Sequence, residues 1–226
     1  MRLLIGNMNY SSWSMRPWLL LTQLQIPFDA EKLSFNDPDF KTRVLALSPV
    51  GQVPVLLDGD LVIRDSLAIA EYLAERFPER GIWPRDPRAR ARARSICAEM
   101  HAGFGALRER LPMNCELVLK NVPFERAVVR DIARIVASWT DCRDQFGAEG
   151  PFLFGAFSAA DAYYAPVVRR FRGFGVAVPQ VVAAYMAAVD ALPAMRAWMT
   201  TALGEHDYVA MDEPYRDRRD EIAGPR

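Results

Sequence analysis

A proline stands where the chain otherwise predicts the first residues of a β-strand. Val53 and Pro54 precede the apolar run from Val55 to Leu57, yet proline has no N–H group to donate to a sheet ladder. Two conformations are open: an ordinary trans proline at the first strand residue, or a cis Val53-Pro54 bond, which is uncommon and usually serves a purpose. A cis bond would turn the N–H and C=O of Val53 toward the first predicted helix. A peptide-like ligand lying between the two could pair with these main-chain groups.

Hydroxyl and acidic side chains mark the start of two predicted helices. Ser11 and Ser12 precede the first helix, and Asp65 and Ser66 open a later one. Such side chains cap the free N–H groups of a helix N-terminus, and those N–H groups together with the helix dipole also attract anions. Capping alone explains each pair. With the proline between them in chain order, a shared ligand site becomes the better explanation.

A set of short elements in the first part of the chain would position these residues. Strands are predicted over residues 2–6, 28–33, 53–57 and 61–63, and helices from residue 12 or 14, from residue 37 and over 65–77. The Asp-Gly turn at 58–60 between two β-rich runs is a strong hairpin signal. Ser12 or Ser14 is expected to cap the first helix, with Pro17 in its first turn, where proline is tolerated. The order β-α-β-α-β-β-α predicts an α/β domain over residues 1–80.

The rest of the chain shows helical periodicity and no strand alternation. Prolines and a glycine punctuate residues 78–87, which suits an interdomain connection, so we place a linker at 81–87 and an all-α domain at 88–226. Helices are predicted over residues 89–111, 125–146, 159–171, 179–192 and 193–203. Ser158 and Asp161 form a capping box ahead of an apolar run. The charged tail at 212–226 is expected to pack weakly or fray.

The charge balance removes any global attraction to nucleic acid. Lys and Arg together number 28, as do Asp and Glu, so no net charge draws the chain to nucleic acid or to an anionic membrane surface. The arginine-rich stretch at 85–94 lacks interleaved aromatic residues and is predicted to be a solvated helix start. Neither a secretory signal nor a run of roughly 20 apolar residues is present. A soluble, cytoplasmic protein is therefore expected, with no membrane and no nucleic acid as partner.

The cysteine pattern fits neither a disulfide framework nor a metal site. Cys97, Cys115 and Cys142 lie far apart without a Cys-x-x-Cys pair, and the chain has only 2 histidines. Each cysteine is expected to be a small apolar residue on a helix. No metal is expected.

Three short motifs together resemble the glutathione site of cytosolic glutathione transferases. They are Val53-Pro54 before a strand, Asp65-Ser66 at a helix start, and Ser11-Ser12 before the first helix. In the second domain, the run from Gly155 to Asp161 is similar to that family's helix-start motif, so the resemblance covers most of the chain. It implies a thioredoxin-like glutathione-binding domain in front of an all-helical domain, with glutathione as co-substrate. It also implies a homodimer.

The resemblance assigns binding roles to individual residues. In that family the residue before the cis proline pairs with the cysteinyl backbone of glutathione, which here is Val53 before Pro54. Gln52 is within reach of the same ligand. Ser66 and the helix N–H groups would hold the γ-glutamyl carboxylate, while Asp65 would pair with its ammonium group.

The glycyl carboxylate of glutathione needs a cation of its own. Lys32 and Lys41 are the nearest candidates in the predicted fold, since an ammonium group pairs well with a carboxylate. We expect Lys32 to bind it.

A hydroxyl group beside the sulfur would carry out the central chemistry. The thiol of glutathione has a pKa of roughly 8.5 to 9, by analogy with free cysteine, so little of it is nucleophilic thiolate at pH 7. A hydroxyl that donates to the sulfur and a nearby helix N-terminus both favour the thiolate. The run Ser-Ser-Trp-Ser-Met-Arg at 11–16 resembles the Ser-Ser-Cys-Ser-Trp-Arg signature of the zeta class, whose members isomerise maleylacetoacetate, with Trp13 in place of the class cysteine. That alignment makes Ser11 the sulfur-facing residue, with Ser12 and Tyr10 as alternatives.

The small electrophile is expected to bind between the first domain and the first long helix of the second. The candidate pocket residues are Met8, Trp13, His101, Phe104 and Arg108. His101 and Arg108 lie two helical turns apart and would share a face with Phe104. Arg108 suits a carboxylate or carbonyl group. An interhelical histidine and a solvated arginine would explain the same residues without a substrate.

These residues predict a glutathione S-transferase of the detoxification type. It would activate the thiol of glutathione as thiolate for attack on a small electrophile, by conjugation, isomerisation or peroxide reduction. The alternative is a non-catalytic glutathione-binding or scaffold protein of the same fold. The presence of all three motifs favours the enzyme, because a scaffold has no need of them. A thiol-disulfide reductase would require a cysteine among residues 11–14, where none stands.

Overall fold

The N-terminal part of the chain is an α/β unit built on one mixed sheet. The structure, a computed structural model, describes residues 1–216. Its first elements are β1 (Arg2–Ile5), α1 (Ser12–Gln23), β2 (Asp29–Lys32), α2 (Phe40–Leu45), β3 (Val55–Asp58), β4 (Leu61–Arg64) and α3 (Ser66–Arg76). The strands lie in the order β2-β1-β3-β4; β1 is parallel to β2 and antiparallel to β3, and β3 is antiparallel to β4. The predicted order of elements is confirmed.

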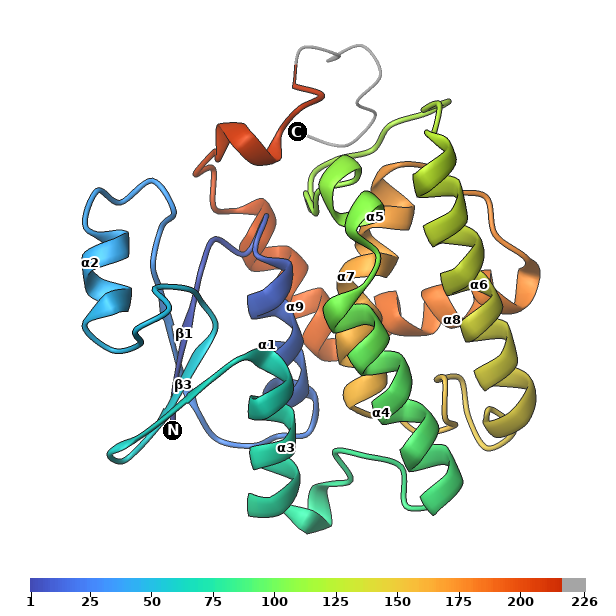
Figure 1. Ribbon diagram of the computed structural model, residues 1–226, viewed down its shortest axis with the longest axis horizontal. Coiled ribbons are helices and arrows are strands. Elements are labelled where there is room, and N and C mark those ends of the chain that lie inside the picture. Colours follow the sequence, from blue (N-terminus) through green and yellow to red (C-terminus); the bar gives the residue numbers. More distant parts are fainter. Residues whose placement is uncertain (217–226) are drawn as a thin grey trace.

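Alternation along the strands sends side chains into two cores on opposite faces of the sheet. Leu3 and Ile5 of β1 belong to the large core that includes α1 and α3. Leu4 of β1 and Val55 of β3 instead pack with Val44 of α2. Figure 1 shows the result, with α1 and α3 on one side of the sheet and α2 on the other. The α1 side of the sheet is also the side that meets the C-terminal helices.

The C-terminal part of the described chain is all-helical, which confirms the predicted fold class. Its helices are α4 (Pro87–Ala102), α5 (Gly105–Arg110), α6 (Arg126–Phe146), α7 (Ala159–Gly173), α8 (Gln180–Ala191) and α9 (Pro193–Leu203), with short 3-10 helices η1 (Pro78–Arg80) and η2 (Ala210–Asp212) before and after them. Helix α7 is buried along most of its length and packs against α1, α4 and α8. No helix within residues 1–216 is long and apolar enough to cross a membrane. The linker placed at 81–87 stays a prediction.

The single helix predicted over residues 89–111 is two helices in the structure. Gly103 and Phe104 separate α4 from α5, and Phe104 has a left-handed backbone with φ 56°. A Cβ atom on Gly103 would lie 2.7 Å from the carbonyl oxygen of Glu99, so only glycine fits where the chain leaves α4. The prediction was wrong because the apolar spacing continues through the break while the backbone changes direction.

Helix α1 is capped by a different serine from the one predicted. Ser11, not Ser12 or Ser14, is the N-cap, and its Oγ lies 3.4 Å from the backbone nitrogen of Ser14. Pro17 therefore falls in the second turn instead of the first. Capping and any role at the sulfur thus fall on the same residue, Ser11.

Part of the tail predicted to fray is packed against the body of the protein. The rings of Tyr215 and Phe174 meet edge to face with their centroids 5.2 Å apart, and the carboxylate of Glu213 accepts a hydrogen bond from the hydroxyl of Tyr10. Weak packing was one of the two expected outcomes for this tail, and the tail residues that make these contacts are partly exposed. Residues 217–226 of that prediction lie outside the described part of the chain.

The capping box that opens α7 is expected to contribute strongly to stability. Asp161 is fully buried and accepts from the backbone nitrogens of Ser158 at 2.9 Å and Leu153 at 3.1 Å. Asp161→Ala leaves both donors unpaired, so we expect the free energy of unfolding to fall by about 2 to 3 kcal/mol in urea denaturation. Glu99→Gln, which breaks an ion pair with Arg134 on the outer surface, is the control and should cost less than about 1 kcal/mol.

The pH dependence of the same variant tests the state of the buried carboxyl. Burial raises the pKa of Asp161 to about 6 from an ordinary value of 3.8. The native protein then binds this proton more tightly than the unfolded chain, so the stability it contributes is greatest at low pH and declines as pH rises through that window. The stability difference between wild type and Asp161→Ala should therefore narrow from pH 4 to pH 6. A difference that widens over this range would contradict the raised pKa.

Candidate active site

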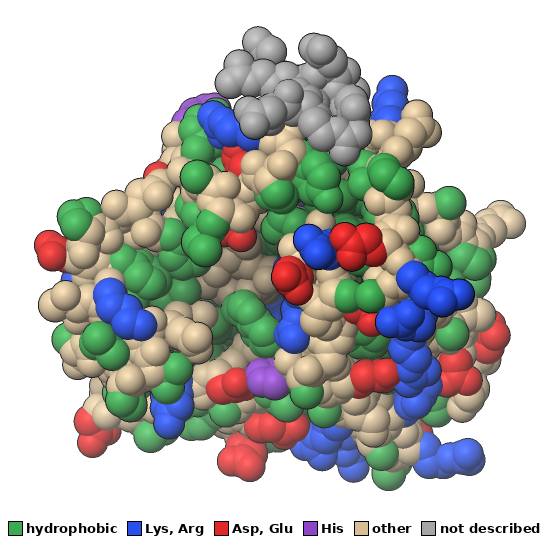
Figure 2. All heavy atoms as spheres, turned by 45° about the horizontal axis from the view of Figure 1, so that its top comes forward, with side chains coloured by type: hydrophobic (Ala, Val, Ile, Leu, Met, Phe, Trp, Pro, Cys, Tyr) green, Lys and Arg blue, Asp and Glu red, His purple; other side chains and the backbone are tan. Residues whose placement is uncertain are grey.

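A cleft with a volume of about 720 Å³ lies between the sheet domain and the helices. Figure 2 shows the surface hollowed there, with apolar side chains on the walls. From the N-terminal domain it is lined by Tyr10, Ser11, Ser12, Trp13, Phe35, Phe40, Ser48, Val50, Gly51, Gln52, Val53, Pro54, Arg64, Asp65 and Ser66. The later lining residues are His101, Arg108, Pro112, Met113, Arg170 and Asp212. The three sequence motifs therefore meet in one cleft.

Two serine hydroxyls stand at the N-terminus of α1, on the cleft wall. The segment that joins β1 to α1, residues 6–11, is named the serine loop here, and all of it is buried. Ser11 Oγ lies 2.7 Å from Ser14 Oγ, which accepts from the backbone nitrogen of Gly6 at 3.1 Å. Ser12 Oγ accepts from Nη2 of Arg170 at 3.2 Å, so the Ser12 hydroxyl keeps its own proton for another acceptor. The Ser12 hydroxyl can donate to an anion at the positive end of the helix, and the Ser11 hydroxyl, which donates to Ser14 Oγ, can do so by turning its proton away from Ser14.

The Val53-Pro54 peptide bond is cis, which confirms the second of the two conformations considered for it. Strand β3 begins only at Val55, and within residues 1–216 neither the N–H nor the C=O of Val53 makes a hydrogen bond. Gln52 lies beside it on the same wall. An extended ligand can pair with these main-chain groups as an added strand would.

Asp65 and Ser66 lie where β4 turns into α3, and their geometry goes beyond simple capping. Asp65 has a φ of 77°, rare for a residue other than glycine, and such backbone strain concentrates at functional sites. Its Oδ1 caps the helix by accepting from the nitrogen of Leu67 at 2.8 Å, and its Oδ2 lies 3.1 Å from Nε2 of His101. Ser66 Oγ is 2.8 Å from the hydroxyl of Tyr163, in the buried floor. The pair presents a carboxylate and a hydroxyl to the cleft.

Three of the five predicted pocket residues come together, whereas Met8 is buried and does not line the cleft. The rings of Trp13 and His101 meet edge to face at 5.2 Å, Arg108 donates to the carbonyl oxygen of His101 at 3.0 Å, and the Arg108 guanidinium lies 5.6 Å from the Trp13 ring centre. Phe104 is buried in the core and does not line the cleft. The break between α4 and α5 at Gly103 turns Phe104 away from the helix face expected to hold all three.

Two buried arginines that the sequence interpretation missed lie behind the serines. Arg16 is 1% exposed, sits between the rings of Trp13 at 3.9 Å and Tyr163 at 4.5 Å, and finds no hydrogen-bond partner within residues 1–216. Arg170 is 5% exposed; Nε donates to the carbonyl oxygen of Leu111 at 2.8 Å, while buried Nη1 has no partner in the same range. Burial lowers the pKa of Arg16 to about 10 and that of Arg170 to about 9. An arginine inside an apolar helix run, as at Arg170, was the available signal.

The two lysines considered for the glycyl carboxylate occupy different positions. Lys32 does not line the cleft, because its Nζ lies 3.1 Å from Oε1 of Glu205 in an ion pair. Lys41 lies against the cleft wall, since a Cβ atom on Gly51 would be 3.1 Å from its Nζ. Gly51 itself lines the cleft. The cation nearer to a ligand is Lys41.

Other candidate nucleophiles and acids near the cleft are held in neutral, buried states. The hydroxyl of Tyr10 donates to Glu213, and burial followed by that hydrogen bond raises the pKa of Tyr10 far above its ordinary value. Cys97, Cys115 and Cys142 are free and buried. Burial raises the pKa of Cys115 to about 12 and of Cys142 to about 11. A packing role for the cysteines fits these values.

Both halves of the chain match the patterns of a known protein family. Residues 10–76 match the pattern of the glutathione S-transferase N-terminal domain, and residues 83–201 match that of the C-terminal domain. The chain belongs to the glutathione S-transferase family. Membership agrees with the thioredoxin-like domain and the helical domain described above.

Individual relatives of this glutathione S-transferase family member are distant. A stringent starvation protein A homolog of Haemophilus ducreyi is 28% identical over 70% of this chain and 69% of its own. Glutathione S-transferase 1 of Dianthus caryophyllus is 41% identical over 40% of this chain and 41% of its own, and a probable maleylacetoacetate isomerase of Caenorhabditis elegans is 31% identical over 43% and 45%. A solved glutathione transferase homolog from Burkholderia with bound glutathione has a TM-score of 0.67 at 22% identity, over 91% of this chain and 98% of its own. That structure shares the fold.

Proposed function

We propose that this protein binds glutathione in the cleft and activates its thiol as a thiolate for attack on a small electrophile. The supporting observation is that Ser11 and Ser12, at the N-terminus of α1, share one cleft with Val53 and with the start of α3. A tripeptide that pairs with the N–H and C=O of Val53 would bring its cysteinyl sulfur toward the serines. Glutathione bound to the Burkholderia homolog is consistent with this.

The ends of glutathione have partners in the same arrangement. Ser66 and the N-terminus of α3 would hold the γ-glutamyl carboxylate, and Asp65 would hold its ammonium group. We propose Lys41 for the glycyl carboxylate, because it lies against Gly51 on the cleft wall whereas Lys32 is bound to Glu205.

The sulfur would be ionised by hydrogen bonding and by positive charge. We propose that the Ser11 hydroxyl donates to it, as the zeta-class resemblance implies. Arg170 lies 3.2 Å from Ser12 and Arg108 lines the same cleft, and nearby positive charge favours the thiolate. The thiol proton leaves to solvent, and the sulfur electron pair forms a bond to the electrophilic carbon. A leaving group then departs in conjugation, or the sulfur itself is expelled in isomerisation.

The electrophile is proposed to carry a carboxylate group. The Nη1 atom of Arg170 is buried and has no hydrogen-bond partner within residues 1–216. Arg170 and Arg108 both line the cleft. Burial raises the pKa of the nearby Asp212, so this carboxyl is a weakened counter-ion for Arg170. A buried guanidinium whose counter-ion is weakened in this way favours an anionic ligand. The relative named as a probable maleylacetoacetate isomerase is consistent with such a substrate.

The purified protein is expected to bind glutathione and to show the ultraviolet difference band of a thiolate at neutral pH. Difference spectra recorded from pH 5 to 9 give the pKa of the bound thiol, which should lie below the roughly 8.5 to 9 of the free thiol. A panel with an aryl halide, an organic hydroperoxide and a maleyl compound identifies the reaction. A protein that binds no glutathione would contradict the proposal.

A second candidate function is a glutathione-binding scaffold without turnover. The similarity to a protein named for stringent starvation, and not for transferase activity, favours it. Glutathione binding without a thiolate band, and without turnover of any compound in the panel, would support it. The homodimer and the cytoplasmic location stay predictions from the resemblance.

A further inference from the structure

The segment that follows α9, residues 204–216, turns back over the N-terminal domain and is named the C-terminal strap here. Figure 1 shows it leaving α9 and passing the connection between β1 and α1. Its acidic side chains bond to the serine loop and to the segment between β2 and α2. These bonds join chain segments about two hundred positions apart, so local sequence does not indicate them.

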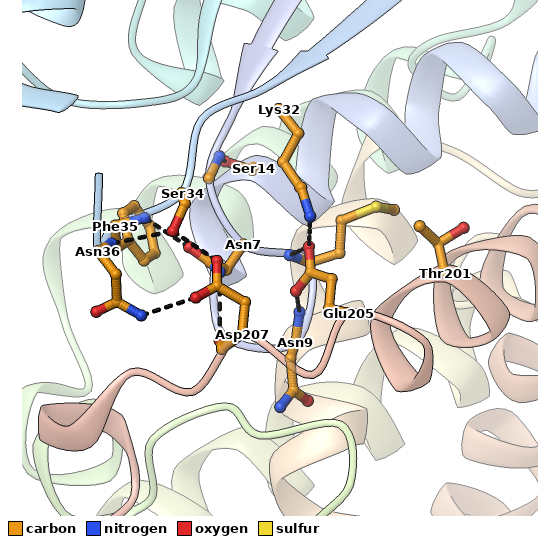
Figure 3. A network of polar contacts seen from close by, with 12 residues as sticks. Asn7, Asn9, Ser14, Lys32, Ser34, Phe35, Asn36, Thr201, Glu205 and Asp207 are labelled. Carbon is orange, nitrogen blue, oxygen red and sulfur yellow. Dashed lines mark hydrogen bonds and ion pairs between the residues drawn. The ribbon is translucent and has the colours of Figure 1, made fainter. Parts of the chain in front are cut away.

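Glu205 of the strap binds two main-chain amides of the serine loop. Its Oε1 accepts from the nitrogen of Met8 at 2.8 Å and its Oε2 from the nitrogen of Asn9 at 3.1 Å, as Figure 3 shows. Lys32 lies 3.1 Å from Oε1, and the Glu205 side chain is only 2% exposed. Within residues 1–216 the two amides have no other acceptor. A single carboxylate therefore satisfies both buried donors.

Asp207 of the strap ties the serine loop to its neighbour in the fold. Its carboxylate accepts from Nδ2 of Asn7 at 2.7 Å, from the hydroxyl of Ser34 at 2.5 Å and from Nδ2 of Asn36 at 2.8 Å. The hydrogen bonds from Ser34 and Asn36 hold the pKa of this carboxyl below its ordinary value. Asn7 in turn accepts from the nitrogen of Phe35 at 2.7 Å. Asp207 thus fixes the outer end of the loop.

The end of the serine loop next to α1 carries Ser11 and is held by a turn that begins at Asn7. The backbone nitrogens of Tyr10 and Ser11 both donate to the carbonyl oxygen of Asn7, at 3.2 and 2.8 Å. Met8 and Asn9 lie between that carbonyl and the serine. The path from Asn7 to Ser11 is held by this internal turn, by the carboxylate of Glu205, and by the backbone nitrogen of Cys115, which donates to Oδ1 of Asn9 at 2.7 Å. Glu205 is the acceptor for the main-chain amides of Met8 and Asn9.

We propose that Glu205 is a positioning residue for the sulfur site, which holds the serine loop by the amides of Met8 and Asn9 and so aims the Ser11 hydroxyl at the sulfur of glutathione. This inference rests on the proposed function. Glu205 does not line the cleft and acts only through the loop.

The negative charge of Glu205 and its hold on the serine loop have opposite effects on the pKa of the bound thiol, which makes the proposal testable. Glu205→Gln removes a negative charge, and that loss by itself would lower the pKa of the bound thiol. The same change leaves one oxygen to accept from one of the two amides and places an NH₂ group against the other N–H donor, so the loop loses one of its two acceptors on residue 205. A rise in the thiol pKa therefore reports lost positioning and not lost charge.

The experiment compares wild type, Glu205→Gln and Glu99→Gln as folded, full-length proteins. Glu99 is the matched control, since it also bonds two donors, on Arg134, at 2.6 and 2.8 Å, and lies away from the cleft. In Glu205→Gln we expect amide hydrogen exchange of residues 6–12 to rise by about tenfold or more. The thiol pKa, read from the thiolate band, should rise by about one unit. The Kd of glutathione should change by less than about threefold, since Val53 and Ser66 are untouched. Glu99→Gln should match wild type in all three.

The outcomes separate this inference from the proposed function. A wild-type protein without glutathione binding overturns the proposed function, and the positioning role with it. Wild-type binding with an unchanged or lowered thiol pKa in Glu205→Gln overturns the positioning role alone. Should Glu205→Gln fail to fold, Glu205→Asp keeps the charge on a shorter side chain and should also raise the thiol pKa. An unchanged pKa in that variant overturns the proposal.

Discussion

Replacing Ser11 by alanine is expected to lower kcat/KM by about 10- to 100-fold and to abolish the thiolate band at neutral pH. A hydrogen bond to a charged group contributes about 1.5 to 3 kcal/mol, which corresponds to this range. The Kd of glutathione should change little, because the main-chain pairing at Val53 and the contacts at Ser66 remain. The measurements are steady-state kinetics, the pH titration of the bound thiol and calorimetry.

A matched serine variant and the neighbouring serine control this result. Ser95→Ala removes a hydroxyl that bonds the carbonyl oxygen of Ala91 on the exposed side of α4, and it should behave as wild type. Ser12→Ala removes the acceptor of Arg170 and should have the smaller effect of the two cleft variants. The reverse order, with the band lost in Ser12→Ala and kept in Ser11→Ala, would assign the sulfur to Ser12.

Replacing Arg170 by methionine is expected to reduce kcat/KM for a carboxylate-bearing electrophile about 30- to 100-fold more than for a neutral aryl halide. The Nη1 group of Arg170 is buried without a partner in the described chain, and a charge-assisted hydrogen bond to a substrate carboxylate would supply one. The quantity to compare is the ratio of kcat/KM for the two substrates. Loss of the positive charge of Arg170 also raises the pKa of the bound thiol and so slows both reactions, and the ratio removes this shared effect.

Two further arginine variants make the test specific. Arg169→Met changes the neighbouring residue on α7, which pairs with Asp190 at 3.4 Å and does not line the cleft, so its substrate ratio should equal that of wild type. Arg108→Met keeps the buried floor intact and should lower the ratio by about tenfold. Equal losses on both substrates in Arg170→Met would show that Arg170 acts only on the sulfur or on stability.

Most of the secondary structure follows from local pattern. The Asp-Gly hairpin at 58–60, the capping box at Ser158 and the helix starts at Pro87 and Pro193 are set by residues within a few positions of one another. Turn chemistry and capping depend on the residue types themselves, so they can be read from a short window. The break at Gly103 escaped prediction, because the apolar spacing continues through it while the backbone changes direction at Phe104, which has a left-handed φ of 56°.

The residues of the candidate site also fall into those that local sequence predicted and those that it did not. Ser11, Val53, Asp65 and Ser66 were predicted because each stands at a strand or helix terminus, where backbone groups are free by construction. Arg16 and Arg170 were not predicted. In sequence an arginine on a helix is most often solvated, and only the packing of α7 against α1 buries them behind the serines.

By itself, the sequence determined the order of elements, the two-part architecture and the polar groups for which we propose contacts with glutathione. Only the tertiary structure decided which cations reach the cleft. It bound Lys32 to Glu205, placed Lys41 beside Gly51, and brought Arg170 to the cleft with a buried nitrogen, Nη1, that has no partner within residues 1–216. The physical reason is distance: capping and turn bonds close within a few residues, whereas a buried ion pair forms between segments that meet only when the whole chain has folded.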